Sequence, residues 1–100
     1  MDPRSYLLAA CMAHMEGYYS TNTLAFKNNN PGNIEKPGGG FQVYPSKVNG
    51  FIALVWDIEA NRGKTLRAFI AKYAPPNENN TSLYLQVVST LSGIGEDEIL

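Results

Sequence analysis

The sequence predicts an α+β fold that is mostly helical, with one small β-hairpin inserted after the first helix. Apolar residues recur at helical spacing in four segments, and residues that favour helix ends bound these segments. Between the first and second segments the chain is polar, and two short extended pieces flank the string PGGG, a pattern typical of a hairpin. The 100 residues contain no linker or internal repeat, so we expect a single domain spanning residues 1–100.

The first helix is expected to begin after Asp2, whose side chain can cap it, with Pro3 at its first position. Gly17 is its natural stop, because glycine readily adopts the left-handed conformation that follows many helix ends. The apolar stripe of this helix consists of Leu7, Leu8, Cys11, Met12 and Met15.

Three more helices are predicted in the second half of the chain. Ser46 caps the second helix, Thr65 the third, and Asn80 or Thr81 the fourth. The second helix presents one apolar face, and Gly63, the pair Pro75-Pro76 and Gly93 stop the three helices in turn. The residues of that face are Val48, Phe51, Ile52, Val55 and Ile58.

The hairpin is expected from Ile34–Lys36 and Phe41–Tyr44, on either side of the glycine-rich turn. The segment before it, Ser20–Asn33, is too rich in polar residues to form a buried element. The final string GEDEIL has the pattern of another capped turn, which is compatible with a longer natural chain.

Composition excludes several classes of function. Eight basic and nine acidic residues are well mixed, for a net charge of −1, so the chain lacks the basic face that binds nucleic acid. One cysteine and one histidine make a disulfide framework or a structural zinc site untenable, and we expect no metal and no cofactor. No apolar run reaches the ~20 residues of a membrane-spanning helix, so we expect no membrane insertion.

Glu16 lies where a carboxylate is unfavourable. It falls in the last turn of the first helix, where the free carbonyl groups disfavour negative charge, and it borders the apolar stripe. Both effects favour the neutral acid and should raise its pKa. A carboxylic acid that stays protonated near neutral pH can protonate a glycosidic oxygen. The alternative is an exposed residue in a frayed turn.

The strings HMEGYY, KNNNPGNIEK, GGFQVYPSKVNGFIAL and YAPPNENN occur in this order over most of the chain. Together they resemble a family of small phage and bacterial lysozyme-like domains, in which an E-G pair, an N-N-P-G-N loop and a Y-A-P…E-N segment follow one another. The resemblance implies a lysozyme-like α+β fold and cleavage of the glycan strands of bacterial peptidoglycan. It also implies that Glu16 is the catalytic acid.

Four asparagines crowd the loop before the hairpin, and turn chemistry around its Pro-Gly pair explains about two of them. An asparagine amide offers both donors and acceptors, which suits hydroxyl and N-acetyl groups. Both Asn30 and Asn33 match the N-N-P-G-N string, and we expect them to line a substrate groove opposite Glu16. Gln42, on the expected hairpin, is a further candidate for substrate binding.

The string YAPPNENN supplies the second polar cluster. Tyr73 closes the apolar stripe of the third helix, so it either packs in the core or steadies the transition state with its hydroxyl group. Glu78 and Asn79 follow in a loop and are expected to bind substrate, although loop acids are commonly only solvated.

Two reaction types remain open. A conventional glycosidase needs two carboxylates, and the candidates for the second are Glu35, Asp57, Glu59 and Glu78. None belongs to a motif as sharp as that of Glu16, which favours a lytic transglycosylase, where a hydroxyl group of the substrate replaces the attacking water. The alternatives are a muramidase, which hydrolyses the same bond, and a phage structural module that binds glycan without cutting it.

The expected partner is therefore the peptidoglycan glycan strand, bound by a monomer in the periplasm or at the cell wall. The N-terminal segment superficially resembles an export signal, but it fits a capped helix better. With no signal peptide visible, we expect a phage-encoded or virion-associated protein.

Overall fold

The computed structural model describes residues 1–100, of which 51% are helical. It contains no β-strand that pairs into a sheet. The five helices are α1 (Pro3–Met15), α2 (Leu24–Lys27), α3 (Lys47–Ala60), α4 (Leu66–Tyr73) and α5 (Thr81–Ser92).

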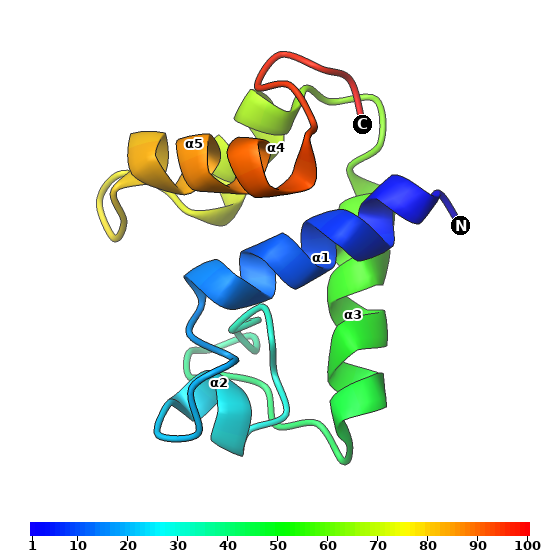
Figure 1. Cartoon of the computed structure of the whole chain (residues 1–100). Coiled ribbons are helices and arrows are strands. Elements are labelled where there is room, and N and C mark those ends of the chain that lie inside the picture. The colour runs from blue at the N-terminus through cyan, green and yellow to red at the C-terminus, as the bar shows by residue number, and fades with distance from the viewer.

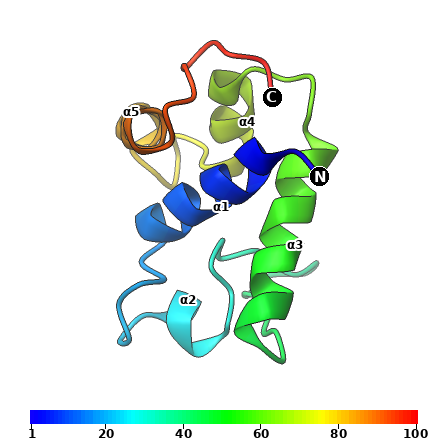
Figure 2. The same cartoon turned by 45° about the vertical axis from the view of Figure 1, so that its right-hand side comes forward.

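Helix α1 runs through the middle of the molecule (Figure 1). Helices α4 and α5 lie together on one side of it, α2 and the loops around it lie on the other, and α3 passes alongside (Figures 1 and 2). Packing joins α1 to both α3 and α5, and α4 to α5. As a result, the C-terminal end of α1 lies near the loop that precedes α3 and the loop that follows α4.

The predicted helix caps are confirmed. The side chains of Asp2, Ser46, Thr65 and Asn80 each accept a hydrogen bond from the first turn of the helix that they precede. Helix α5 ends at Gly93, which has a φ of 75°. The one helix that the sequence did not predict is the short α2, capped by Thr23.

The main hydrophobic core joins α1, α3, α4 and α5. Its fully enclosed side chains come from all four helices, among them Leu8, Met12, Leu54, Ile58, Leu66, Phe69, Ile70 and Val88. The predicted face of α3 is partly wrong, because Val48 and Ile52 are 67% and 45% exposed while Leu54 is enclosed. A second, smaller cluster packs Tyr18 against Ala13 and Ala25, below the end of α1.

The predicted hairpin is wrong, and with it the α+β class, including the lysozyme-like α+β fold that the resemblance implied. Residues 34–44 do fold back at the PGGG turn, but they form one isolated bridge, between Glu35 and Phe41, and no strand. The observed architecture is all-helical with irregular loops.

Asparagine side chains explain why no ladder forms. Asn30 Nδ2 donates to the carbonyl oxygens of both Ile34 and Gln42, and Asn30 Oδ1 accepts from the Ile34 amide. The Gln42 amide still donates to the Ile34 carbonyl at 2.8 Å, but the Ile34 amide and the Gln42 carbonyl, which a longer ladder would have joined to each other, both bond to Asn30. The Tyr44 amide bonds instead to the Asn28 carbonyl, which ties the returning segment to the loop.

Helix α3 approaches this loop closely at Gly50. A Cβ atom there would lie 2.9 Å from the Pro31 ring and closer still to the Asn29 carbonyl, so only glycine fits without a shift of the backbone.

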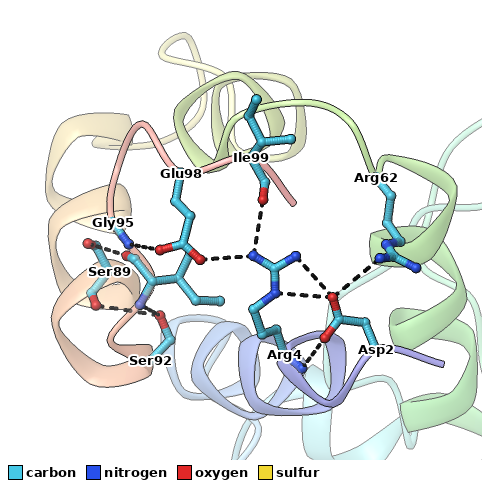
Figure 3. Close-up of polar contacts among 9 residues, drawn as sticks. Asp2, Arg4, Arg62, Ser89, Ser92, Gly95, Glu98 and Ile99 are labelled. Carbon is cyan, nitrogen blue, oxygen red and sulfur yellow. Dashed lines mark hydrogen bonds and ion pairs between the residues drawn. The ribbon is translucent and has the colours of Figure 1, made fainter.

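The two ends of the chain are joined by charged side chains. Arg4, near the start of α1, binds Asp2 on one side and the carboxylate of Glu98 on the other, and it also donates to the Ile99 carbonyl (Figure 3). No helix is long and apolar enough to cross a membrane.

Candidate functional site

An open cavity of about 560 Å³ lies at the C-terminal end of α1. This volume falls within the usual range for small-ligand sites, roughly 300–1,000 Å³. The wall is formed by the end of α1, the asparagine loop, α3, α4 and the loop after α4. We call it the Glu16 cavity; its lining residues are Glu16, Gly32, Asn33, Ile34, Glu35, Phe41, Asp57, Asn61, Phe69, Lys72, Tyr73, Pro75, Glu78 and Asn79.

Glu16 is placed by the way α1 ends. It is the C-cap residue, and its amide still donates to the Met12 carbonyl at 3.0 Å. Gly17 then turns the chain with a φ of 78°. The Tyr18 amide donates back to the Ala13 carbonyl at 3.0 Å, so the turn is closed by hydrogen bonds. The side chain of Glu16 is therefore held at a fixed point at the edge of the core.

Neutral donors hold the Glu16 carboxyl group from both sides. The Tyr84 hydroxyl donates to Oε2 at 2.8 Å, and Asn33 Nδ2 donates to Oε1 at 3.1 Å. Burial raises the pKa of Glu16, and these two hydrogen bonds only partly oppose it. The predicted direction of the pKa shift is confirmed, with burial as its main cause.

Tyr84 is the contact that the sequence did not reveal. It belongs to α5, is 4% exposed, and lies 68 residues from Glu16 along the chain. Its apolar spacing predicts a core residue, which is correct for the ring but says nothing of the hydroxyl group. Burial, followed by the charge of Glu16, raises the pKa of Tyr84, so it remains a donor at all ordinary pH values.

Asn33 connects the loop to the acid. It has a φ of 48°, a left-handed conformation that asparagine tolerates better than most residues. Its Nδ2 also lies 3.3 Å from the Glu16 carbonyl oxygen, which otherwise faces outward at the helix end. The Oδ1 atom of Asn33 is buried and has no hydrogen-bond partner. Asn33 therefore lies in the cavity wall, as expected from the sequence.

Asn30 and Gln42 do not line the cavity. Asn30 is completely buried, and both ends of its amide bond to the backbone. Gln42 contributes its carbonyl oxygen to one of these bonds. Their observed contacts shape the loop, and no contact of either side chain with the cavity is seen.

Tyr73 does line the cavity, but its hydroxyl group is engaged. It donates a short hydrogen bond to the Gly32 carbonyl, which ties α4 to the asparagine loop. A Cβ atom on Gly32 would lie 2.8 Å from the Leu54 side chain and would also collide with this hydroxyl. The ring packs on Phe69. Burial raises the pKa of Tyr73.

The loop after α4 forms the opposite rim. Both Glu78 and Asn79 line the cavity and are exposed, and their amides bond to the Pro75 carbonyl. Asn79 Nδ2 also donates to that carbonyl at 3.4 Å, so Glu78 is the residue of this pair whose side chain has no partner within the protein.

Three of the four candidate second carboxylates lie in the same cavity: Glu35, Asp57 and Glu78. Glu59 does not; it accepts hydrogen bonds from the Ser5 hydroxyl and the Asp2 amide instead. Burial raises the pKa of Asp57, opposed by the charges of two lysines on the same side of the cavity.

No group of three or more His, Cys, Asp or Glu side chains could hold a metal ion. Comparisons of the chain with models of protein families, with curated proteins and with solved structures found no match.

Proposed function

We propose that this protein cleaves the glycan strands of bacterial peptidoglycan, with Glu16 as the general acid. The observation that carries the proposal is a convergence. Three motif segments that are separated in the sequence, and that contain Glu16, Asn33 and the Glu78-Asn79 pair respectively, contribute to the lining of one cavity. A carboxyl group with a raised pKa faces that cavity among amide groups that suit sugar hydroxyl and N-acetyl groups.

In the proposed reaction, the proton of Glu16 passes to the glycosidic oxygen as the bond from that oxygen to the sugar C1 breaks. The resulting carboxylate keeps its hydrogen bonds from Tyr84 and Asn33, which stabilise the charge. In the protonated state, a half-turn of the Asn33 amide would let its unpartnered Oδ1 accept the carboxyl proton.

Lytic transglycosylase chemistry is the preferred form of the reaction. The Glu16 carboxylate then removes the proton of the muramic acid 6-hydroxyl, whose oxygen bonds to C1 and closes an anhydro ring. Glu16 is protonated again, and no water is consumed. The scheme needs one acid, which fits a site where one carboxyl group alone is held by two specific donors.

Hydrolysis by a muramidase is the second candidate, and one observation favours it. Glu35, Asp57 and Glu78 share the cavity with Glu16, so a second carboxylate is available to activate water or attack the sugar.

The deciding experiment is digestion of purified peptidoglycan by the wild-type protein and by Glu16→Gln, with mass spectrometry of the products. We expect products one water lighter than reducing muropeptides, and a loss of about 10²–10⁴-fold in rate in the variant. Full-mass reducing ends, lost in the variant, would instead identify a muramidase. Unchanged activity in the variant would refute Glu16 as the acid. If neither protein cuts but both bind glycan, the protein is a binding module.

A further inference from the structure

Two lysines meet at the α3 side of the Glu16 cavity. The Nζ atoms of Lys64 and Lys72 lie 2.8 Å and 3.4 Å from the same atom, Asn61 Oδ1. Asn61 is 4% exposed and caps the end of α3, and it lines the cavity together with Lys72 and Asp57. Two ammonium groups therefore converge on one buried amide oxygen of the cavity wall: that of Lys72, a lining residue, and that of Lys64, which lies beside the lining.

Both lysines are exposed, and the protein supplies few partners to their ammonium groups. Each offers three donors, and Asn61 Oδ1 is the one protein acceptor that either contacts. Neither forms an ion pair, whereas Arg4, Arg62 and Arg67 all do. Although Lys64 is exposed, slight desolvation and then the charge of Lys72 lower the pKa of Lys64, as expected for like charges held close together.

The nearby carboxyl group does not cancel this charge. Asp57 is the one acid whose charge acts on both lysines, and its Oδ1 atom lies 3.4 Å from Asn61 Nδ2. Even when Asp57 is ionised, two positive charges face one negative charge.

The attraction of lysines to a helix C-terminus does not account for the pair either. Such lysines usually contact free carbonyl oxygens, whereas both of these contact the Asn61 side chain. The Asp57 carbonyl at this helix end is already bonded to Asn61 Nδ2, at 2.7 Å.

We propose that Lys64 and Lys72 bind a carboxylate carried by the muramic acid side group, so that the cavity selects acidic glycan strands over uncharged amino-sugar chains. This inference rests on the proposed function, since it assigns the part of the same substrate that enters this side of the cavity. The lining acids Glu16, Glu35 and Glu78 form no ion pair with either lysine, so both ammonium groups remain available to a carboxylate of the substrate.

The test measures binding, so that it does not depend on turnover. The Glu16→Gln protein would be titrated by calorimetry with three soluble glycans. One carries peptide stems, one has been stripped of its stems by an amidase and keeps only lactyl carboxylates, and one is a chitin oligosaccharide with no carboxylate. Lys72→Gln and Lys64→Gln would be added to the same background. Lys27→Gln, an exposed lysine of α2 away from the cavity, serves as the charge-matched control.

We expect Lys72→Gln and Lys64→Gln to weaken binding of a carboxylate-bearing glycan by about tenfold, with no effect on chitin and no effect from Lys27→Gln. Loss confined to the stem-bearing glycan would assign a stem carboxylate, because the lactyl group of that glycan is held in an amide bond. Loss confined to the stripped glycan would assign the lactyl carboxylate, and loss with both would show that the lysines accept either one. Lys72→Arg should retain most of the affinity, which separates charge from folding. Equal weakening on chitin, or unchanged binding of acidic glycans, would overturn the proposal even if the wild-type protein cleaves peptidoglycan. If the lysine variants bind acidic glycans more weakly but the wild-type protein cleaves no peptidoglycan, the carboxylate site is supported and the cleavage proposal fails.

Discussion

The two ends of helix α1 carry carboxyl groups in opposite surroundings. At the N-terminal end, Asp2 caps the helix and is bonded to Arg4, with the guanidinium group of Arg62 3.5 Å away (Figure 3). At the C-terminal end, Glu16 is bonded to a tyrosine and an asparagine, and no cation lies within ion-pair distance.

The pKa values of the two acids move in opposite directions for this reason. Hydrogen bonds from Arg4 lower the pKa of Asp2, whereas burial raises the pKa of Glu16. Helix polarity acts in the same sense, because the N-terminus of a helix favours negative charge and the C-terminus disfavours it. The same helix therefore carries one acid whose surroundings favour the ionised form and one acid whose surroundings favour the protonated form.

Among changes that leave both acids in place, the largest effect on activity should come from removing the tyrosine donor that holds Glu16. Tyr84→Phe deletes the hydroxyl group that bonds to Oε2 and keeps the buried ring. We expect kcat/KM on peptidoglycan to fall by about tenfold, in line with the roughly 1.5–3 kcal/mol of a hydrogen bond to a charged group. Because this bond lowers the pKa of Glu16, its loss should raise that pKa further.

A pH–rate profile separates this positioning role from a general loss of structure. Glu16 must be protonated to act, so activity falls as pH rises through its pKa, and this limb should move to higher pH in Tyr84→Phe. Tyr6→Phe, at an exposed position of α1, is the control and should leave the profile in place. An unmoved alkaline limb in Tyr84→Phe would argue against the assigned role.

Local chemistry explains which parts of the fold could be predicted from the sequence. The helix starts at Asp2, Ser46, Thr65 and Asn80 depend on side chains that bond within the next turn, so short patterns identify them. The prediction of a hairpin is wrong for a different reason. The Asn30 side chain bonds to the Ile34 amide and the Gln42 carbonyl, which would otherwise pair with each other, and hairpin patterns take no account of a buried amide that competes for them.

The residues of the candidate site also fall into those that local sequence indicates and those that only tertiary packing brings in. Glu16 is predicted from its place in the last turn of one helix beside an apolar stripe, together with the E-G pair of the family resemblance. Tyr84, Asn61 and Lys72 could not be predicted, since only tertiary packing brings α3, α4 and α5 to the end of α1, and the sequence offers Asp57 as one of four candidate second carboxylates without choosing it. Each of them also has an ordinary local interpretation, as a core, capping or solvated residue.

Burial of Glu16 should lower the free energy of unfolding at neutral pH. A carboxyl group whose pKa is raised by folding destabilises the folded protein once pH passes its ordinary value of 4.5, because the folded state resists ionisation. Glu16→Gln removes this cost and can keep both hydrogen bonds, since the tyrosine hydroxyl both donates and accepts. We expect the variant to be more stable at neutral pH by about 0.5–2 kcal/mol.

Denaturant unfolding of wild type and Glu16→Gln at several pH values measures this effect. The gain should shrink as pH falls and disappear below about pH 4, where the wild-type carboxyl group is protonated in both states. If the variant is less stable than wild type at neutral pH, ionised Glu16 stabilises the fold, and the contrast with Asp2 fails.

The smallest effect is expected at the other end of the helix. Asp2→Asn keeps a good capping side chain but removes the negative charge that faces Arg4 and Arg62. Folding lowers the pKa of Asp2, so its charge stabilises the folded protein above its ordinary value of 3.8, and this contribution is lost as pH falls through the lowered pKa. The variant should therefore melt slightly below wild type at neutral pH and together with it in strong acid. Its pH dependence is then opposite in sign to that of Glu16→Gln.

High salt should reduce the difference in melting temperature between Asp2→Asn and wild type, because exposed ion pairs are screened. Thermal melts over pH and salt would show it, and a penalty for Asp2→Asn that persists in acid would mean that its partners contribute by packing, with no role for charge at this end of α1.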